Sequence, residues 1–575
     1  MSSHKALGCV AAIVAFAALF VSASAPAADR PAARPIAQNS EDPPPKASSA
    51  PGPHEKPAAH RPMPVPPALR LVAPPVPVIR GDYVSVQVNV DENGDNIVGD
   101  AANEPSIAVD PRNPLRMAIG WRQFDTIESD FRQAGVAYTT DEGRSWTFTG
   151  VLDPGVFRSD PVLDADADGN FYYDSLTVNS LYTCDVFKST DGGKTWGPPV
   201  YAYGGDKAWM AIDRTGGVGH GNIYAAWDWA GCCGDDWFNR SVDGGASWDK
   251  PVPIPEQPIW GTTTVSPFGE VYIAGRRAST DKEFVLVGSS TAQYPEGPLT
   301  FDFATQIDMG GRHQYYLQDG PNPGGLISQA WVACDHTGGP THGNIYVLCS
   351  VKPNAGDDPL DVHFIRSEDD GQTWTAPIRV NDDPLDNGAW QWFGTMSVGQ
   401  SGRIDAIWAD TRDDPDGYDS VVYYSYSLDA GDTWSPNEAI TPSFDPHLGW
   451  PQQDKLGDYY DMVSDRVGAH LAYAATFNGE QDIYYLRLGD YDCNHNGIGD
   501  AHDIADGTSS DDDGDGIPDD CQCLSDIVAD GTVDVLDLLQ VLAQWGTSGG
   551  ADVNYDGIVD VLDLLVVLGA WGACP

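Results

Sequence analysis

The stretch Ser189-Thr190-Asp191-Gly192-Gly193-Lys194-Thr195-Trp196 decides the fold, because the same pattern recurs along the chain. Each copy reads Ser/Thr-x-Asp-x-Gly-x-x-Trp and follows a run of alternating residues. The Asp can accept backbone N–H groups and the Gly can adopt positive φ, so the pattern indicates a hairpin turn. Burying the Trp removes roughly 200 Å² from water, worth on the order of 5 kcal/mol before entropy is counted. The other copies span 139–146, 241–248, 367–374 and 427–434.

The spacing of these turns predicts a β-propeller. Neighbouring copies are about 50 to 60 residues apart, except for one interval roughly twice as long. Each unit has room for four strands, which is typical of propeller blades. The long interval is expected to hide a blade whose turn has decayed at 289–301. Six units fit between 104 and 443. Strands at 459–463, 469–474 and 482–488, completed by one starting at Tyr83, would make another. We expect an all-β propeller of seven blades, with six as the alternative.

The repeated turn is similar to the Asp-box of the sialidase (BNR-repeat) superfamily, whose members are β-propellers. On such a fold, loops entering the inner strands and loops leaving the second strands share the face opposite the repeated turns. Carboxylates, guanidinium groups and indole rings on that face would suit a sugar. Inner-strand starts place there Glu104, Asp160, Asp206, Lys207, Trp209, Trp390, Trp392, Asp458, Tyr459 and Tyr460, and second-strand ends add Arg122, Trp227, Asp228, Arg276, Asp410 and Arg412.

The resemblance also implies roles for some of these residues. Sialidases bind the substrate carboxylate with three arginines and use a Tyr nucleophile, a carboxylate that assists it and an Asp as acid/base. The Arg-Ile-Pro segment before the family's first blade has no counterpart at 79–81 or 157–159, so roles are assigned by blade position. Substrate binding falls to Arg122, Arg276, Arg412, Trp209, Trp390 and Trp392, and catalysis to Tyr459 or Tyr460 with Glu104 or Asp160.

Three functions are compatible with this resemblance. One is an exo-α-sialidase-like glycoside hydrolase that acts on an extracellular glycan or glycoprotein. The second is a non-catalytic cell-surface propeller that binds glycan or protein, because the turn motif reports architecture rather than activity. The third is a propeller hydrolase or lyase of other specificity. Whether the chain is an enzyme stays open at this point.

The C-terminal segment has a different composition, with no Lys or Arg after Arg487 while Asp recurs. Residues 492–503 place oxygen ligands at the calcium-loop positions of an EF-hand, with Gly497 at the turn. Similar loops begin at 511, 526 and 552, and the last two lead into apolar, helix-like runs. The predicted Ca²⁺ ligands are Asp492, Asn494, Asn496, Ile498, Asp500, Asp503, Asp511, Asp513, Asp515, Asp519, Asp526, Asp530, Asp534, Asp537, Asp552, Asn554, Asp556, Ile558, Asp560 and Asp563.

The last two loops, 26 residues apart, resemble a type I dockerin over residues 523–575. The resemblance implies a cohesin-like partner, which dockerins contact partly through loop positions 10 and 11. Those positions are often polar in cellulosomal dockerins, whereas both copies here carry Val-Leu, at 535–536 and 561–562. A cell-surface partner of another kind, or self-packing of the module, is an equal alternative.

Length and charge bound the remaining possibilities. The chain has 575 residues and a formal net charge of −52, which argues against nucleic acid and anionic membranes as partners. Residues 1–28 are expected to be a secretory signal with a cleavage site at 25–27, an uncleaved anchor being the alternative. We therefore expect a secreted or cell-surface protein without a membrane span in the mature chain. The expected domains are a Pro/Ala-rich linker (29–79), the propeller (80–489), calcium loops (490–522) and the dockerin-like module (523–575).

The cysteines suggest disulfides, as an oxidising compartment allows. Cys334 and Cys349 flank a turn and are expected to bridge a hairpin. Cys232 and Cys233 are adjacent and either bond to each other or leave one to pair with Cys184. A final group consists of Cys493, Cys521, Cys523 and Cys574.

Overall fold

The computed structural model describes residues 78–573, apart from 179, 281–282, 415–416, 495, 512–513, 515, 522, 524, 529–531, 548–550, 552 and 554–557. The expected signal segment lies outside the described residues, as does the expected linker up to residue 77. The first strand, β1, begins at Val78, two residues inside the expected linker. No helix among the described residues is long and apolar enough to cross a membrane.

Seven antiparallel sheets follow one another along the chain. Blades 1 to 3 consist of β3 (Ala101–Val109), β4 (Met117–Phe124), β5 (Gln133–Thr139) and β6 (Thr147–Leu152); β7 (Ser159–Ala165), β8 (Phe171–Val178), β9 (Tyr182–Ser189) and β10 (Val200–Tyr201); and β11 (Trp209–Ile212), β12 (Ile223–Ala226), β13 (Asp236–Ser241) and β14 (Val252–Pro253).

Blades 4 and 5 each have a divided inner edge, so that two short segments pair with the same second strand. Blades 4 to 6 consist of β15 (Pro258–Ile259), β16 (Thr263–Val265), β17 (Val271–Arg277), β18 (Phe284–Ser289) and β19 (Phe303–Ile307); β20 (Gly311–Arg312), β21 (Trp331–Cys334), β22 (Ile345–Pro353), β23 (Asp361–Ser367) and β24 (Ile378–Arg379); and β25 (Gln391–Val398), β26 (Ile404–Asp410), β27 (Val421–Ser427) and β28 (Glu438–Ala439).

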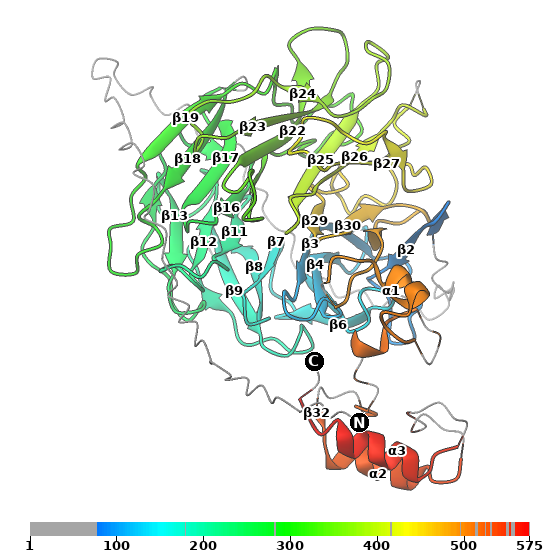
Figure 1. The fold of residues 1–575 in the computed structure, drawn as a ribbon. Helices are drawn as coiled ribbons and strands as arrows, with labels where there is room; N and C mark the ends of the chain where they lie inside the picture. The colour runs from blue at the N-terminus through cyan, green and yellow to red at the C-terminus, as the bar shows by residue number, and fades with distance from the viewer. Residues whose placement is uncertain are drawn as a thin grey trace, which may run out of the picture.

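Blade 7 joins the two ends of the propeller. Its inner strands are β29 (Asp461–Ser464), β30 (Gly468–Ala475) and β31 (Asp482–Gly489), and its outer strands are the N-terminal β2 (Tyr83–Gln87) and β1 (Val78–Arg80). β2 pairs with β31 in the register Ser85↔Leu486. The inner strands contact one another from β3 round to β29, and β29 in turn contacts β3 (Figure 1). The seven-bladed prediction, with a strand near Tyr83 closing the ring, is confirmed, and the six-bladed alternative is wrong.

The repeated turn joins the third and fourth strands of its blade, and its hydrogen bonds explain the residue pattern. In blade 2 the Ser189 hydroxyl accepts the Gly193 N–H at 2.9 Å. The Asp191 carboxylate accepts the N–H of Thr195 at 2.9 Å and its hydroxyl at 2.5 Å. The Trp196 indole N–H donates to the Gly193 carbonyl at 3.0 Å. These bonds lower the pKa of Asp191 although burial opposes them.

Two constraints act on the glycine of this turn. In blade 6, Gly431 has φ +87°, and a Cβ placed there would lie 2.1 Å from the Phe364 ring of blade 5. Gly143 in blade 1 has φ +85° and would meet Tyr485 of blade 7 at 2.3 Å. Only glycine meets both the backbone and the space requirement, so the turn also brings neighbouring blades into close contact.

The decayed turn of blade 4 lies where the long interval predicts it, between β18 and β19. The Ser289 hydroxyl donates to the Thr300 carbonyl at 2.6 Å, and the Ser290 hydroxyl donates to Asp302. In place of a Trp, Phe301 packs against Phe238 of blade 3 with ring centroids 5.0 Å apart. The contact to the preceding blade survives although the motif does not.

The cysteines show one correction. Cys334 and Cys349 are free and buried, because Cys334 pairs with Ile345 across the hairpin and Cys349 stands four residues further along that strand. The predicted Cys334–Cys349 bridge is therefore wrong. Cys232 and Cys233 bond to each other, which resolves the alternative with Cys184.

The described residues of the C-terminal segment include three short α-helices and one 3-10 helix. The part after blade 7 packs on blade 1, where the Arg144 guanidinium lies 4.1 Å from the Tyr491 ring and Leu115 packs with Cys493 and Ile517. In the last part, apolar side chains form a small core of their own, including Val541 and Val567. The elements are α1 (Asp500–Asp506), the 3-10 helix η2 (Asp519–Cys521), β32 (Thr532–Val533), α2 (Val535–Ala543), α3 (Val561–Gly569) and β33 (Gly572–Ala573).

The repeated turn yields a stability prediction. Replacing Asp243 by Ala removes its bonds to the Ser247 N–H (2.8 Å) and hydroxyl (2.6 Å) in blade 3. We expect a loss of about 1 kcal/mol in the free energy of unfolding, measured by denaturant titration. Asp235→Ala, an exposed carboxylate in the same blade, is the control and should leave stability unchanged. Equal effects of the two substitutions would contradict the role given to the turn.

Candidate functional site

A left-handed residue marks the start of the inner edge in several blades. Glu104, Asp160 and Lys207 hold φ values of 52°, 46° and 53° in blades 1, 2 and 3. In blades 1 and 2 the ladder between the first two strands shifts register at this residue. Such backbone conformations cost of order 1–3 kcal/mol each in non-glycine residues and persist only where the surroundings enforce them. Trp260 and Phe393 have φ values of 55° and 56° in blades 4 and 6. Three consecutive blades thus hold a charged side chain at the same level of the ring.

Lys207 is the hub of these charges. Its ammonium nitrogen lies 2.5 Å from a carboxylate oxygen of Asp458, 3.3 Å from one of Asp160 and 3.6 Å from one of Asp206. Its side chain is only 7 % exposed. Burial alone would raise the pKa of Asp160 and Asp458, but Lys207 outweighs it and holds both well below their usual range. These two carboxylates are therefore ionised at neutral pH.

Glu104 and Arg122 form a second, fully buried pair. The Arg122 Nε lies 3.1 Å from Glu104 Oε2 and donates to the Asn103 side-chain oxygen at 2.8 Å. Lys455 approaches Glu104 at 3.6 Å and Asp458 at 2.8 Å, which links the two pairs. Burial raises the pKa of Glu104 to about 7, with Arg122 opposing the shift. Among the described residues, neither carboxylate oxygen of Glu104 nor the two terminal nitrogens of Arg122 has a hydrogen-bond partner.

An aromatic side adjoins these charges. Asp228 accepts the Trp260 indole N–H at 3.2 Å, and burial raises the pKa of Asp228 to about 7. The Arg276 guanidinium stacks on the Trp260 ring at 4.3 Å. Tyr316 is 48 % exposed. Its pKa is raised by partial burial and is also affected by the charges of Asp458, Lys207, Asp206 and Asp228. We call Glu104, Arg122, Asp160, Asp206, Lys207, Asp228, Lys455 and Asp458 the central cluster.

The central cluster holds carboxyl groups in two protonation states. Asp160 and Asp458 are ionised, whereas the pKa of Glu104 is about 7 and burial raises that of Asp206 well above its usual range. Neighbouring carboxyl groups whose environments move their pKa values apart can divide the work of general acid and general base. The cluster therefore has the elements of proton transfer at neutral pH.

The structure separates the two tyrosine candidates. Tyr459 adjoins the cluster: its hydroxyl donates to the Pro161 carbonyl at 2.8 Å, and burial together with Glu104 and Asp160 raises its pKa well above the usual range. Tyr460 faces the core, where its hydroxyl donates to the Ala474 carbonyl at 2.8 Å. A nucleophilic role for Tyr460 does not fit this position.

The predicted substrate-binding residues are dispersed. Arg122 belongs to the central cluster, whereas the Arg412 guanidinium is held by Asp382 and Asp410, each at 2.8 Å. Trp209 is buried against Tyr459, with ring centroids 5.5 Å apart, and Trp390 is partly exposed. Trp392 is fully buried, so it offers no ring face to a sugar, and its predicted stacking role is wrong.

Sequence reasoning missed Lys455, Trp260 and Tyr316. Lys455 lies three residues before Asp458, in a loop that has no counterpart in the repeat. Trp260 occupies the left-handed position of blade 4, equivalent to Glu104 in blade 1. An alignment of all blades at the starts of their inner strands could have found Trp260. No pattern in the sequence marks Lys455 or Tyr316.

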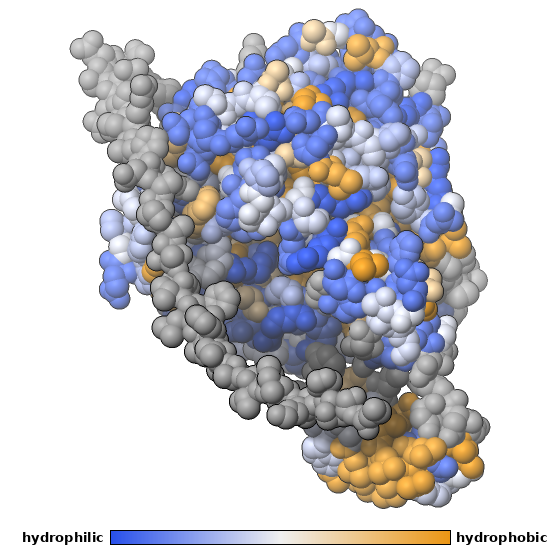
Figure 2. Space-filling view, in the orientation of Figure 1, coloured by the Kyte–Doolittle hydropathy of each residue, from blue (hydrophilic) through white to orange (hydrophobic). Residues whose placement is uncertain are grey.

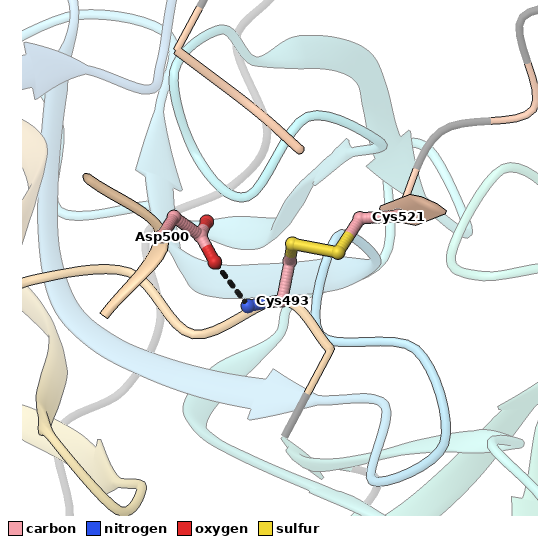
Figure 3. A group of neighbouring side chains, drawn as sticks. All are labelled: Cys493, Asp500 and Cys521. Carbon is pink, nitrogen blue, oxygen red and sulfur yellow. Dashed lines mark hydrogen bonds between the residues drawn. A yellow bond between two sulfur atoms is a disulfide. The ribbon is translucent and has the colours of Figure 1, made fainter. Parts of the chain in front are cut away.

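Side chains of the first predicted calcium loop hydrogen-bond one another and the loop backbone. Asn494 and Asn496 donate their side-chain amides to Asp503 at 3.0 and 2.6 Å, and Asp492 accepts the N–H groups of Asn496 and Gly497. Asp500 instead accepts the Cys493 N–H at 2.9 Å beside the Cys493–Cys521 disulfide (Figure 3). The sulfur atoms there are bonded to each other, so the cluster of Cys493, Asp500 and Cys521 offers no thiolate to a metal.

The later loops are only partly described. Asp511 accepts the N–H groups of Gly514 and Gly516, and Asp519 accepts the Ser510 hydroxyl. Asp526 and Ile558 are described too. At the starts of α2 and α3, the pairs Asp534–Asp537 and Asp560–Asp563 form reciprocal capping bonds. The predicted ligands Asp513, Asp515, Asp530, Asp552, Asn554 and Asp556 lie outside the described residues.

The electrostatics of the cluster can be tested with Lys207→Met. Without the ammonium group, burial raises the folded pKa of Asp160 and Asp458 above the unfolded value of about 3.9. The free energy of unfolding of this variant is then highest below the unfolded pKa of about 3.9, and it falls as the pH rises through the raised pKa of the folded state. We expect about 3 kcal/mol of destabilisation at pH 8 and clearly less at pH 5, from unfolding titrations at both pH values. Lys250→Met, at an exposed lysine, should leave the free energy of unfolding unchanged at both pH values. An equal loss of stability at pH 5 and pH 8 in Lys207→Met would contradict the ionised state of Asp160 and Asp458.

Comparisons with known proteins give a fold-level likeness. No protein-family model and no curated protein matches the chain. Among solved structures, a protein of unknown function from Dyadobacter fermentans is 15% identical with a TM-score of 0.40, over 72% of this chain and 100% of that one. An α-L-arabinofuranosidase from Fusarium graminearum is 10% identical with a TM-score of 0.38, over 72% and 98%. A Hadza microbial sialidase is 13% identical with a TM-score of 0.35, over 65% and 76%. At these values the likenesses assign neither substrate nor reaction to this chain.

Proposed function

We propose that the central cluster binds an extracellular glycan and hydrolyses a glycosidic bond. The observation that carries the proposal is that Glu104, whose pKa is about 7, and the ionised Asp160 belong to one buried network of ion pairs. The network connects them through Lys207, Asp458 and Lys455. Glu104 would donate its proton to the glycosidic oxygen, and Asp160 would stabilise the positive charge that develops at the anomeric carbon. The glycosidic C–O bond would break as its oxygen takes the Glu104 proton, and water would then give its hydroxide to the anomeric carbon and its proton back to Glu104.

Arg122 would bind the substrate. Its two terminal nitrogens are buried and have no hydrogen-bond partner among the described residues, which is costly for a guanidinium group. A sugar hydroxyl or carboxylate would satisfy them. Tyr316, half exposed beside the cluster, offers an aromatic face to a sugar ring. An exo-acting, sialidase-like reaction is the form that the family resemblance suggests, and Tyr459 would be its nucleophile.

A second function is favoured by a specific observation. Lys207, Asp160 and Asp458 are at most 7 % exposed and form ion pairs with one another, as a structural ion network would. In that case the same face of the propeller would recognise a glycan or protein at the cell surface without turnover.

Hydrolysis separates these functions. On a panel of fluorogenic glycosides that includes a sialoside, we expect turnover that falls as pH rises through about 7, because Glu104 then loses its proton. Glu104→Gln should lower kcat by about 10³-fold. Glu142→Gln is the matched control: Glu142 is a fully buried glutamate in the repeated turn of blade 1. Glycan binding without turnover would contradict the hydrolase and favour the non-catalytic binding function. Full activity of Glu104→Gln would contradict the assignment of Glu104 as the acid.

We further propose that the C-terminal segment binds Ca²⁺. Asp500 and Asp503 are buried, each with one carboxylate oxygen that lacks a hydrogen-bond partner among the described residues. The segment has no Lys or Arg to balance such charges. Calcium prefers carboxylate, amide and backbone oxygens of this kind.

Chelation tests this. EGTA should reduce the helical circular dichroism at 222 nm, and added calcium should restore it. Asp563→Asn keeps the acceptor for its capping bond to the Asp560 N–H but removes a charge, so it should weaken the calcium response by at least tenfold in concentration. Asp506→Asn, an exposed acid of the same segment outside the predicted ligands, is the control. An unchanged circular dichroism spectrum after chelation would contradict calcium binding by this segment.

The helix pair offers a docking face. Its exposed apolar residues repeat at an interval of 26, as in Leu536 and Leu562 or Trp545 and Trp571. Figure 2 shows hydrophobic surface gathered over α2 and α3. A face of this kind marks an interaction site on a soluble protein. We propose that it attaches the chain to a cohesin-like or other cell-surface partner, after export directed by residues 1–28.

A further inference from the structure

The Cys232–Cys233 disulfide lies beside the central cluster. It belongs to the loop between β12 and β13, which leaves the second strand of blade 3 and therefore lies on the face of the cluster. This loop also carries Asp228, a member of the cluster. The opposing segment, from Gly204 to Asp206, leads directly into Lys207, whose left-handed backbone places its ammonium group among the carboxylates.

A short two-stranded ladder connects the disulfide to Lys207. The Cys232 N–H donates to the Gly204 carbonyl at 3.1 Å. Gly205 and Gly231 form an isolated antiparallel bridge. The Asp206 N–H then donates to the Ala230 carbonyl at 2.9 Å, and the Asp228 N–H donates to the Asp206 carbonyl at 3.1 Å. Four successive contacts thus run from the disulfide to the residue before Lys207.

The ladder has no room for a side chain at its centre. A Cβ on Gly205 would lie 2.8 Å from the Gly231 Cα, and a Cβ on Gly231 would lie 2.5 Å from the Gly205 Cα. The two backbones therefore approach as closely as glycine allows. On its other side this segment contacts the buried Cys184, whose sulfur lies 3.7 Å from the Gly205 carbonyl oxygen.

We propose that the Cys232–Cys233 disulfide is a positioning element of the central cluster: it anchors the ladder that holds Asp206 and Lys207 against Asp160 and Asp458. The Cys residues touch no substrate and act through the backbone. A closed eight-membered ring between adjacent residues removes freedom from the loop, and the ladder transmits this order to Lys207. The inference concerns assembly of the cluster and holds whether the cluster hydrolyses glycans or only binds them.

The consequence is that the cluster assembles only after oxidation. Two thiols, of Cys232 and Cys233, lose two protons and two electrons to a disulfide donor of the thiol–disulfide class, which is released as two thiols. One S–S bond forms in the loop as the donor's S–S bond breaks. The expected export of the chain would take it to a compartment where such donors are present.

Hydrogen exchange of the full-length chain tests the ladder directly. In the double variant Cys232→Ser/Cys233→Ser we expect the backbone amides at positions 206, 228 and 232 to exchange at least tenfold faster than in the unsubstituted chain. The Asp213 amide, which donates to Asn222 elsewhere in blade 3, should be unaffected. Cys493→Ser/Cys521→Ser removes the other described disulfide and should leave all of these amides protected. If the serine variant does not fold, reducing the folded chain gives the same comparison. Unchanged protection after either treatment would overturn the proposal.

A second readout separates positioning of Lys207 from loop order alone. If the disulfide places Lys207, the double serine variant should lose more stability at pH 8 than at pH 5, as Lys207→Met does. Combining the serine substitutions with Lys207→Met should add no further dependence on pH, because the ammonium group is already gone. Additive pH effects, or a pH-independent loss in the serine variant, would show that the disulfide orders its loop without placing Lys207. Neither result depends on hydrolysis, so failure of the proposed function would be seen separately.

Discussion

Pairing between β2 and β31 is the interaction on which the rest of the structure depends. It joins the start of the described chain to the last blade and is extended by the Val88 N–H, which donates to the Ile483 carbonyl at 2.8 Å. Without it, β31 would be an unpaired edge strand of blade 7. Since Lys455 and Asp458 precede blade 7 whereas Glu104 begins blade 1, the central cluster exists only in the closed ring.

The central cluster balances burial against charge. It contains more carboxyl groups than cations, so the ammonium and guanidinium groups cannot keep every carboxyl ionised in a low-dielectric interior. The closest partners of Lys207 remain ionised, and Glu104 and Asp228 have pKa values of about 7. The imbalance itself provides groups that can release a proton near neutral pH. The surrounding structure holds Glu104, Asp160 and Lys207 in the left-handed backbone conformation that this arrangement contains.

The parts of the fold that sequence reasoning predicted are those with local causes. The repeated turn satisfies its hydrogen bonds within eight residues, so its pattern is visible without the structure, and its period gives the number of blades. Tyr459 and Tyr460 are consecutive residues just before β29, and their hydroxyls donate to different carbonyls, those of Pro161 and Ala474. Both are tyrosines, so nothing in the sequence tells which of them contacts the cluster.

Contacts between blades could not be predicted in the same way. Arg412 follows its strand as expected, but its partner Asp382 belongs to a loop that only the ring brings near. Lys455 lies in a loop with no repeated pattern. The Cys334–Cys349 prediction failed because the hairpin is centred between residues 339 and 340, so that Cys334 faces Ile345 and Cys349 lies four residues further from the turn.

The pairing of β2 with β31 also bears on the order of folding. Ser85 and Leu486 are register partners although about 400 residues separate them, so their pairing carries a large loop-closure entropy and a high contact order. Blades 1 to 6 can form from neighbouring segments as the chain emerges, while the β1–β2 hairpin waits for its partner strand. We therefore expect the pairing of β2 with β31 to be among the last steps of folding. A chain interrupted before β31 can form the earlier blades and still leave the ring open.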